Sequence, residues 1–261
     1  MQFLQHKGIV LHYQWRDYKK PRTFLFINSL GTDFRIWDDV VEILKNDGNI
    51  LLFDKRGHGL SDTNDRTNGL EDYLGDAMTL LYHLSINKCI VVGLSVGGMI
   101  AQLMAYHHPE LIDKLILCDT RSRIADKTFW NNRIQQVELS GLANISDSIM
   151  QRWFPKSFHQ NSPEKIAGYK NMLERCSPRG YNQTCAAIRD ADLTGKSMEI
   201  KFPALCVVGS EDLSTTPAEV KELSALIAGS TFTVIEGSGH LPCVDNPALL
   251  SKHIRDFINK P

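Results

Sequence analysis

The sequence predicts an α/β fold with a mostly parallel central sheet flanked by helices. Short apolar runs alternate along most of the chain with longer segments of helical periodicity. Strands that are apolar on both faces and separated by helices are typical of parallel sheets covered on both sides. The chain has 261 residues, of which 43% are hydrophobic and 23% charged, so it is long enough for one domain with a substantial core.

The candidate elements follow one another in a regular order. Strands are predicted at Thr23–Asn28, Asn49–Phe53, Lys88–Val92, Lys114–Cys118, Ala204–Val208 and Thr231–Ile235. Helices are predicted near Phe34–Lys45, Leu70–Leu84, Gly97–His107, Pro217–Ala228 and Pro247–Ile258. The last two begin with proline, which suits the first turn of a helix. Ahead of this pattern, an antiparallel hairpin is predicted at one edge of the sheet, formed by Phe3–Gln5 and Ile9–Trp15.

The alternation stops between Arg121 and about Gly195, where the pattern is mainly helical. We expect residues 121–195 to form a helical cap inserted into a core made of residues 1–120 and 196–261. The cap holds eleven Lys/Arg and seven Asp/Glu, a net charge of +4, whereas the remainder carries −5. Either this excess reflects solvated helix faces, or the cap attracts an anionic substrate.

Composition excludes several classes of function. A net charge of −1 gives no reason to expect nucleic acid or a membrane surface as a partner. No stretch approaches the roughly 20 apolar residues that span a bilayer, and we expect no secretory signal. The six cysteines include no C-x-x-C pair, so we expect them to be reduced and the protein to be cytoplasmic. We expect neither a metal nor a cofactor, and the oligomeric state stays open.

The pentapeptide Gly93–Gly97, with Ser95 at its centre, is the most informative motif. It lies between a predicted strand and a predicted helix, where G-x-S-x-G forms a nucleophile elbow. In that turn the serine hydroxyl is exposed at the C-terminal edge of the sheet, beside a helix N-terminus. The motif is short enough to occur by chance, so the prediction rests on this context.

A nucleophilic serine requires a base and an orienting carboxylate, here expected in the order Ser, Asp or Glu, His. Asp212 and His240 each follow a predicted strand in that order. Glu211 is the alternative acid, but the shorter side chain of Asp212 suits a fixed bond to an imidazole. We therefore predict Ser95, Asp212 and His240 as a catalytic triad.

The same motif predicts where an oxyanion would bind. One donor should be the N–H of Val96, the residue after the nucleophile, and the second should come from the loop after the Thr23–Asn28 strand. In that loop we select the N–H of Leu30, because Gly31 gives the backbone room to approach. His58, in a glycine-rich loop, is expected to be structural rather than a second base.

Taken together, these motifs resemble the α/β-hydrolase superfamily over essentially the whole chain. Several stretches are more specific and are similar to the 3-oxoadipate enol-lactonase family. They are Asn28–Asp33 with Trp37, Asp54–Ser61, Gly93–Gly98, Trp130–Ile134, Arg152–Phe154, Arg179–Tyr181 and Ala187–Asp192. Lys55 stands where the family often has Thr, a departure that we do not expect to affect the chemistry.

The resemblance implies hydrolysis of a small anionic enol-lactone to 3-oxoadipate, in the β-ketoadipate route of aromatic catabolism, without a cofactor. Arg133 and Arg189 are the expected partners of the substrate carboxylate, although each has a structural ion pair as its alternative. We expect Trp130 or Trp153 to line the pocket. The competing functions are a general carboxylesterase, a hydrolase of C–C bonds, and a ligand-binding protein that retains the fold without activity.

Overall fold

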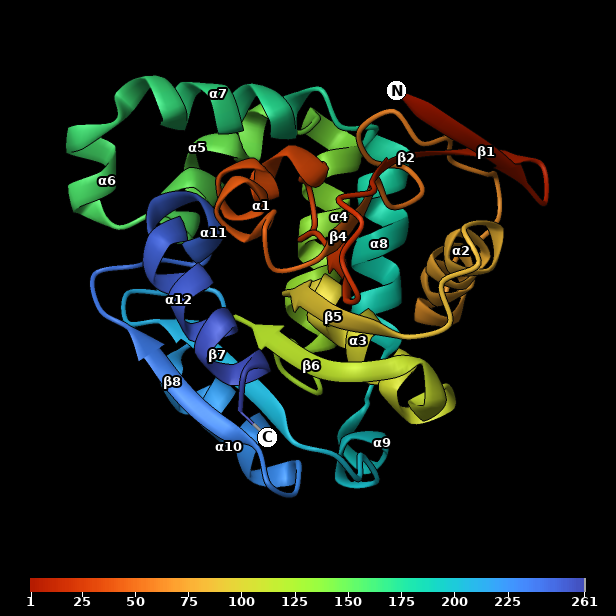
Figure 1. Cartoon of the computed structure of the whole chain (residues 1–261). Coiled ribbons are helices and arrows are strands. Elements are labelled where there is room, and N and C mark those ends of the chain that lie inside the picture. The colour runs from red at the N-terminus through yellow and green to blue at the C-terminus, as the bar shows by residue number, and fades with distance from the viewer. Residues whose placement is uncertain (261) are drawn as a thin grey trace.

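The computed structural model describes residues 1–260 and is built around an eight-stranded sheet of order β1-β2-β4-β3-β5-β6-β7-β8 (Figure 1). The strands are β1 Gln2–His6, β2 Ile9–Arg16, β3 Thr23–Ile27, β4 Asn49–Phe53, β5 Cys89–Leu94, β6 Ile112–Cys118, β7 Ala204–Gly209 and β8 Thr231–Ile235. β1 pairs with β2 and β2 with β4 in antiparallel fashion, whereas all pairs from β4 to β8 are parallel. The predicted fold class is therefore confirmed, including the edge hairpin.

Helices cover both faces of this sheet (Figure 1). Those of the expected core are α1 Asp38–Leu44, α2 Leu70–His83, α3 Val96–His107, α10 Pro217–Leu226, α11 Pro242–Asp245 and α12 Pro247–Ile258, with short 3₁₀ turns η1 Phe34–Trp37 and η2 Pro109–Leu111. The central strands β4, β5 and β7 are buried along their whole length, which explains why each reads as an uninterrupted apolar run.

Between β6 and β7 the chain forms helices only. They are α4 Lys127–Ser140, α5 Ala143–Trp153, α6 Lys156–Asn161, α7 Pro163–Glu174, α8 Pro178–Asp190 and α9 Thr194–Met198. α4 packs on α5 and α8, and α7 packs on α5 and α6, whereas α9 contacts α3 and α10. We propose that α4–α8 form the cap and that α9 belongs with the core.

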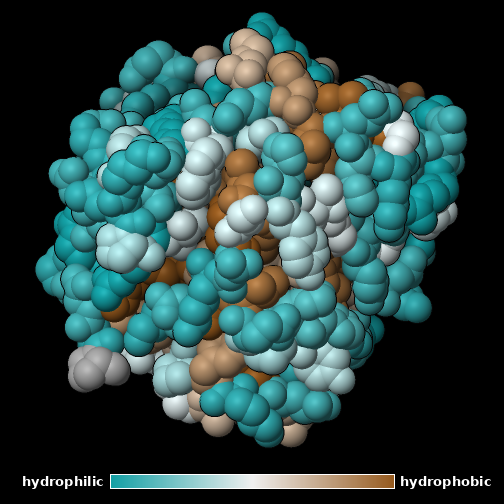
Figure 2. All heavy atoms as spheres, turned by 45° about the vertical axis from the view of Figure 1, so that its right-hand side comes forward, coloured by the Kyte–Doolittle hydropathy of each residue, from teal (hydrophilic) through white to brown (hydrophobic). Residues whose placement is uncertain are grey.

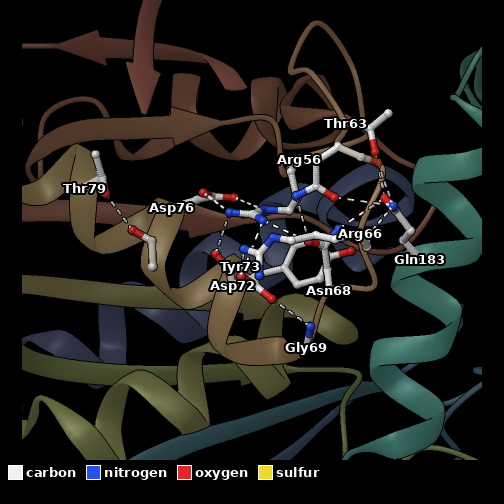
Figure 3. Close-up of polar contacts among 12 residues, drawn as sticks. Arg56, Thr63, Arg66, Asn68, Gly69, Asp72, Tyr73, Asp76, Thr79 and Gln183 are labelled. Atoms are coloured by element: carbon white, nitrogen blue, oxygen red, sulfur yellow. Dashed lines mark hydrogen bonds and ion pairs between the residues drawn. The ribbon is translucent and has the colours of Figure 1, made fainter. Parts of the chain in front are cut away.

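A buried ion pair helps to join the expected cap to the core (Figure 3). The Arg56 guanidinium donates to both carboxylate oxygens of Asp76 in α2, at 2.7 and 2.6 Å, and to Asn68 Oδ1 at 3.0 Å. Asn68 in turn donates to Gln183 of α8 at 3.2 Å. The paired guanidinium therefore orders a core loop that also holds a cap helix.

The face shown in Figure 2 is mostly hydrophilic, and its hydrophobic side chains gather mainly in a central hollow. Most apolar side chains of the chain lie instead in one continuous core on both sides of the sheet. Among the described residues, none of the helices combines the length and apolar composition that crossing a membrane requires.

Candidate active site

Ser95 occupies a strained turn between β5 and α3. Its backbone has φ 57° and ψ −120°, a conformation that is costly for a residue with a side chain. A Cβ on Gly97 would lie 2.2 Å from the Ile27 carbonyl oxygen, and one on Gly93 would lie 2.4 Å from the Gly97 carbonyl oxygen. The glycines are thus required for the close backbone approach that points Ser95 away from the sheet.

Asp212 and His240 are brought together at the same edge, after β7 and β8. The His240 Nδ1 atom lies 2.8 Å from Asp212 Oδ2, and both side chains are almost fully buried. Asp212 Oδ1 also accepts the N–H groups of Ser214 and Thr215 at 2.7 and 3.1 Å. With Nδ1–H donated to this fixed carboxylate, His240 Nε2 is left as the proton acceptor. Glu211 is exposed, so it is Asp212 that holds the imidazole.

The loop that carries His240 is held from two sides. The His240 N–H donates to the Trp153 carbonyl oxygen at the end of α5, at 2.8 Å. The Asp245 carboxylate accepts the Gly239 N–H at 2.7 Å and the Ser238 hydroxyl. Burial raises the pKa of Asp245 to about 6. Sequence reasoning did not single out Asp245, because its role depends on the fold of a loop.

Both predicted oxyanion donors are near Ser95, since Val96 follows it in the chain and Leu30 lines the same cavity. The N–H groups of Leu30 and Val96 form no hydrogen bond within residues 1–260, so both are available. Val96 is the first residue of α3, where an N–H has no partner inside the helix. Ser95 and Leu30 line the same cavity. This arrangement fits two N–H groups converging on one oxygen.

The cavity above Ser95 has a volume of about 300 Å³ and is lined by residues of both the expected core and the expected cap. Its core side includes Ser95 and His240. Trp130 and Trp153 both line its cap side, and each is 6% exposed. The indole N–H of Trp130 donates to the Ile124 carbonyl oxygen at 2.6 Å, which fixes the ring orientation. A site of this size suits a small molecule.

Two arginines of the cap line this cavity without an acidic partner. Among residues 1–260, no carboxylate lies within 4 Å of the Arg133 or Arg152 guanidinium. Arg133 donates only to the Tyr181 hydroxyl at 3.2 Å, and the two guanidiniums lie 5.4 and 5.6 Å from the Phe129 ring centre. Burial and the neighbouring Arg133 lower the pKa of Arg152. Two adjacent cations in a partly buried cavity favour an anionic ligand.

Arg189, in contrast, does not line the cavity. Its guanidinium donates to Asp190 at 2.9 and 2.7 Å and to Asn131 at 2.9 Å. Arg189 thus forms the ion pair that was its alternative, and its expected contact with the substrate stays a prediction. The arginine that sequence reasoning missed is Arg152. It stands in a stretch already singled out for its family resemblance, but its lack of a partner is visible only in three dimensions.

His58 is also placed away from the reaction. Its side chain is buried, and its Nδ1 lies 3.2 Å from the Arg56 carbonyl oxygen. Burial lowers the pKa of His58 well below its ordinary value, so the ring is neutral. His58 is not among the residues that line the cavity, which agrees with a structural role.

A second buried acid, Asp119, lies behind the Asp212–His240 pair. It follows β6, adopts a positive φ of 46°, and accepts the Gly209 N–H through Oδ1 at 2.9 Å. Its other oxygen has no partner that is a conventional donor among residues 1–260. Burial and the nearby Asp212 raise its pKa well above the ordinary value of 3.8. Asp212 was predicted as an acid a few residues after an apolar strand, and the same rule would have found Asp119, which directly follows β6.

Three buried side chains each offer an atom that could bind a metal ion, and these atoms lie within 4.8 Å of one another. The residues are Asp119, Asp212 and His240. Asp212 Oδ2 already accepts the Thr215 hydroxyl at 2.7 Å in addition to its bond with His240. A hydrogen-bond network accounts for this cluster, and the absence of a metal stays a prediction.

A larger groove of about 840 Å³ lies on the far side of the Gly31 loop. Its lining includes Asp33, Arg35, Lys165 and Tyr169, but neither Ser95 nor His240. We therefore centre the candidate active site on the smaller cavity.

Comparison with known proteins agrees with this geometry. A family model described as serine aminopeptidase, S33, matches residues 21–246. The chain is 31% identical to 3-oxoadipate enol-lactonase 2 of Acinetobacter baylyi over 94% of this chain and 91% of that protein. The crystal structure of the enol-lactonase from Burkholderia xenovorans LB400 superimposes with a TM-score of 0.96 at 29% identity, covering 99% of this chain and 100% of that one. A malate-bound thermophilic esterase from Thermogutta terrifontis gives 0.92 at 26% identity, covering 99% and 98%. The chain belongs to the α/β-hydrolase superfamily and is a hydrolase related to the 3-oxoadipate enol-lactonases.

Proposed function

We propose that this hydrolase opens 3-oxoadipate enol-lactone to 3-oxoadipate, with Ser95, Asp212 and His240 as its catalytic triad. One observation carries the substrate assignment: Arg133 and Arg152, which have no carboxylate within 4 Å among residues 1–260, share a cavity with Ser95. A guanidinium binds a carboxylate through paired, charge-assisted hydrogen bonds. A small lactone with a carboxylate side arm supplies both the carbonyl for Ser95 and the anion for the arginines. The related enol-lactonases support the same choice.

In the proposed mechanism, His240 Nε2 takes the hydroxyl proton of Ser95 as its oxygen attacks the lactone carbonyl. The N–H groups of Leu30 and Val96 receive the negative oxygen of the tetrahedral intermediate. The ring C–O bond then breaks, leaving an acyl-enzyme and an enol that ketonises. Water activated by His240 attacks the acyl carbonyl and releases the dicarboxylate, and the proton returns to Ser95. Asp212 holds the imidazole in one orientation through both half-reactions.

The first experiment follows the ultraviolet absorbance of the enol-lactone with the wild type and with Ser95→Ala. We expect rapid loss of the lactone signal with the wild type only. Circular dichroism provides the control that the variant is folded. Appreciable turnover by folded Ser95→Ala would contradict the role of Ser95, whereas an inactive, folded wild type would contradict the lactone assignment.

The second experiment tests how the anion is recognised. Arg152→Met and Arg133→Met should each raise KM for the lactone about 10- to 100-fold, because each removes a charge-assisted bond of about 1.5–3 kcal/mol. KM for neutral p-nitrophenyl acetate should stay nearly unchanged. Arg189→Met is the matched control, because that guanidinium pairs with Asp190 outside the cavity. Equal effects on both substrates would argue for a structural role of Arg133 and Arg152.

A general carboxylesterase is the second candidate function. It is favoured by the likeness to the Thermogutta esterase and by the two tryptophans of the cavity, which would accept apolar acyl groups. Under this alternative, kcat/KM for p-nitrophenyl acetate would exceed that for the lactone. Replacing Arg133 or Arg152 would then change kcat/KM for the ester and for the lactone by a similar factor.

A further inference from the structure

The Lys55 amine is buried in an unusual place. Lys55 follows β4 and its side chain is fully buried, yet among residues 1–260 no carboxylate lies within 4 Å of Nζ. The amine instead donates to two backbone carbonyl oxygens, those of Asn28 at 3.0 Å and Ser29 at 2.8 Å. Lysine is almost never fully buried unless it is paired, because an unpaired charge is costly to remove from water. A buried lysine held only by carbonyl groups therefore requires an explanation.

The Ser29 carbonyl belongs to the same peptide group as the Leu30 N–H. Besides Lys55, this oxygen accepts the Thr32 hydroxyl at 2.8 Å and the Thr32 N–H at 3.4 Å. Donors on the oxygen of an amide polarise it and strengthen its N–H as a donor, and the effect is larger where the local dielectric is low. The Leu30 N–H is at the same time one of the two groups assigned to the oxyanion. Lys55 thus acts on the far end of the peptide that would bind the developing charge.

We propose that Lys55 is a positioning residue of the oxyanion hole. It fixes the Asn28–Leu30 loop and polarises the Ser29–Leu30 peptide, so that the Leu30 N–H binds the oxyanion more strongly. This inference rests on the proposed acyl-transfer chemistry of Ser95, but not on the identity of the lactone. It also corrects the expectation that Lys55 does not affect the chemistry. Lys55 is not among the residues that line the cavity, and its amine is bonded to the loop carbonyls instead.

Lys55, unlike its neighbours Cys176 and His58, titrates near neutral pH. Burial lowers the pKa of Lys55 to about 7. Asp54 and Asp33 oppose this shift from the β4 and β3 loops. Burial raises the pKa of Cys176 to about 12 and lowers that of His58 well below its ordinary value, so both stay neutral. The positive charge on the amine is therefore lost as the pH rises through about 7.

The test compares Lys55→Met with the wild type, using p-nitrophenyl acetate and an aryl trifluoromethyl ketone, which forms a hemiketal with the serine. We expect the acylation rate to fall about 10- to 100-fold, less than the complete loss of an oxyanion donor. KM should stay within about 2-fold, because the polarised N–H acts mainly on the transition state. The inhibition constant of the ketone should rise by the same factor as the rate falls.

Two further variants separate positioning from a purely structural role. Arg56→Met removes the neighbouring buried cation, whose partners lie in α2 and its preceding loop rather than in the oxyanion loop. It should lower Tm without changing ketone binding in the folded fraction. Lys55→Gln retains a neutral donor, so its activity should lie between wild type and Lys55→Met. It also provides the measurement if Lys55→Met fails to fold.

The pH profile gives an independent readout. The acylation rate of the wild type should decline above about pH 7 as Lys55 loses its charge, and this decline should be absent in Lys55→Met and Lys55→Gln. Unchanged rates and ketone affinity in both folded variants would overturn the proposal. An inactive wild type towards the lactone with normal ester hydrolysis would refute only the substrate, whereas ester hydrolysis by Ser95→Ala would refute the acyl-transfer chemistry itself.

Discussion

Asp119→Asn tests whether the acid behind the Asp212–His240 pair carries a proton. Burial and the Asp212 carboxylate raise the pKa of Asp119, so the native state holds a proton that the unfolded chain releases near pH 3.8. Asparagine is neutral and similar in shape, retains an acceptor for the Gly209 N–H, and tolerates the positive φ at this position. It therefore mimics the protonated acid.

The magnitude follows from proton linkage. A folded-state pKa above the unfolded value gives stability that is complete below pH 3.8 and is lost as the pH rises, at about 1.4 kcal/mol per pH unit while only the native state holds the proton. Because asparagine does not titrate, the Asp119→Asn variant does not lose stability in this way as the pH rises. Its free energy of unfolding, relative to wild type, should therefore increase by about 1.4 kcal/mol for each pH unit between about 4 and the folded-state pKa of Asp119.

Urea unfolding of wild type and Asp119→Asn at several values between pH 5 and 8 measures this slope. The ester hydrolysis rate at pH 7 should change less than about 3-fold, since the neutral state at this position is preserved. Asp119→Ala is the matched control: it leaves the Gly209 N–H unpaired and should destabilise by about 1–3 kcal/mol. A stability difference that is constant with pH, together with a large loss of activity in Asp119→Asn, would refute a protonated Asp119.

Three further predictions follow from the described contacts. Gly97→Ala would place a Cβ 2.2 Å from the Ile27 carbonyl oxygen, so the elbow must shift, and we expect kcat for an ester to fall at least about 100-fold. Asp212→Asn cannot hold the same imidazole tautomer and should lower kcat roughly 10⁴-fold without unfolding the protein, as stopped-flow acylation and circular dichroism would reveal. Arg56→Met leaves the Asp76 charge buried without its partner and should cost about 3–5 kcal/mol in urea unfolding, and a loss below 1 kcal/mol would contradict this account.

The fold and the Asp212–His240 contact were predictable because both follow from local patterns. Each parallel strand is an apolar run, and its C-terminal end meets the others at one edge of the sheet. Polar residues in the loops that follow such runs were therefore expected to gather, namely Ser95, Asp212 and His240. Strand boundaries moved by only one or two residues, as at β5 and β6, where pairing with a neighbour decides where the strand ends.

The remaining features depend on which side chains lack a partner, and sequence does not reveal this. Arg189 and Arg152 both lie in the last turn of a helix between β6 and β7, yet Arg189 pairs with the adjacent Asp190 and no carboxylate among the described residues lies within 4 Å of Arg152. In the sequence, Lys55 is a polar loop residue with no evident effect on the chemistry. The structure shows that its amine donates to the carbonyl oxygens of Asn28 and Ser29. For both Arg152 and Lys55, the proposed role of the charge depends on the tertiary structure, which shields the charged group from water and places no carboxylate of the described residues within 4 Å of it.

In the proposed mechanism, reactivity and substrate choice are carried by different segments of the chain. The proposed nucleophile, base and oxyanion donors belong to the sheet edge, whereas the two guanidiniums that lack a carboxylate within 4 Å among residues 1–260 come from α4 and α5. The segments meet where the Trp153 carbonyl at the end of α5 accepts the His240 N–H. A substrate anion that draws Arg152 inward acts on the helix whose last residue holds the catalytic loop. We therefore propose that binding at the cap and alignment of the base are coupled through this backbone hydrogen bond, so a lactone without its carboxylate should lose kcat as well as affinity.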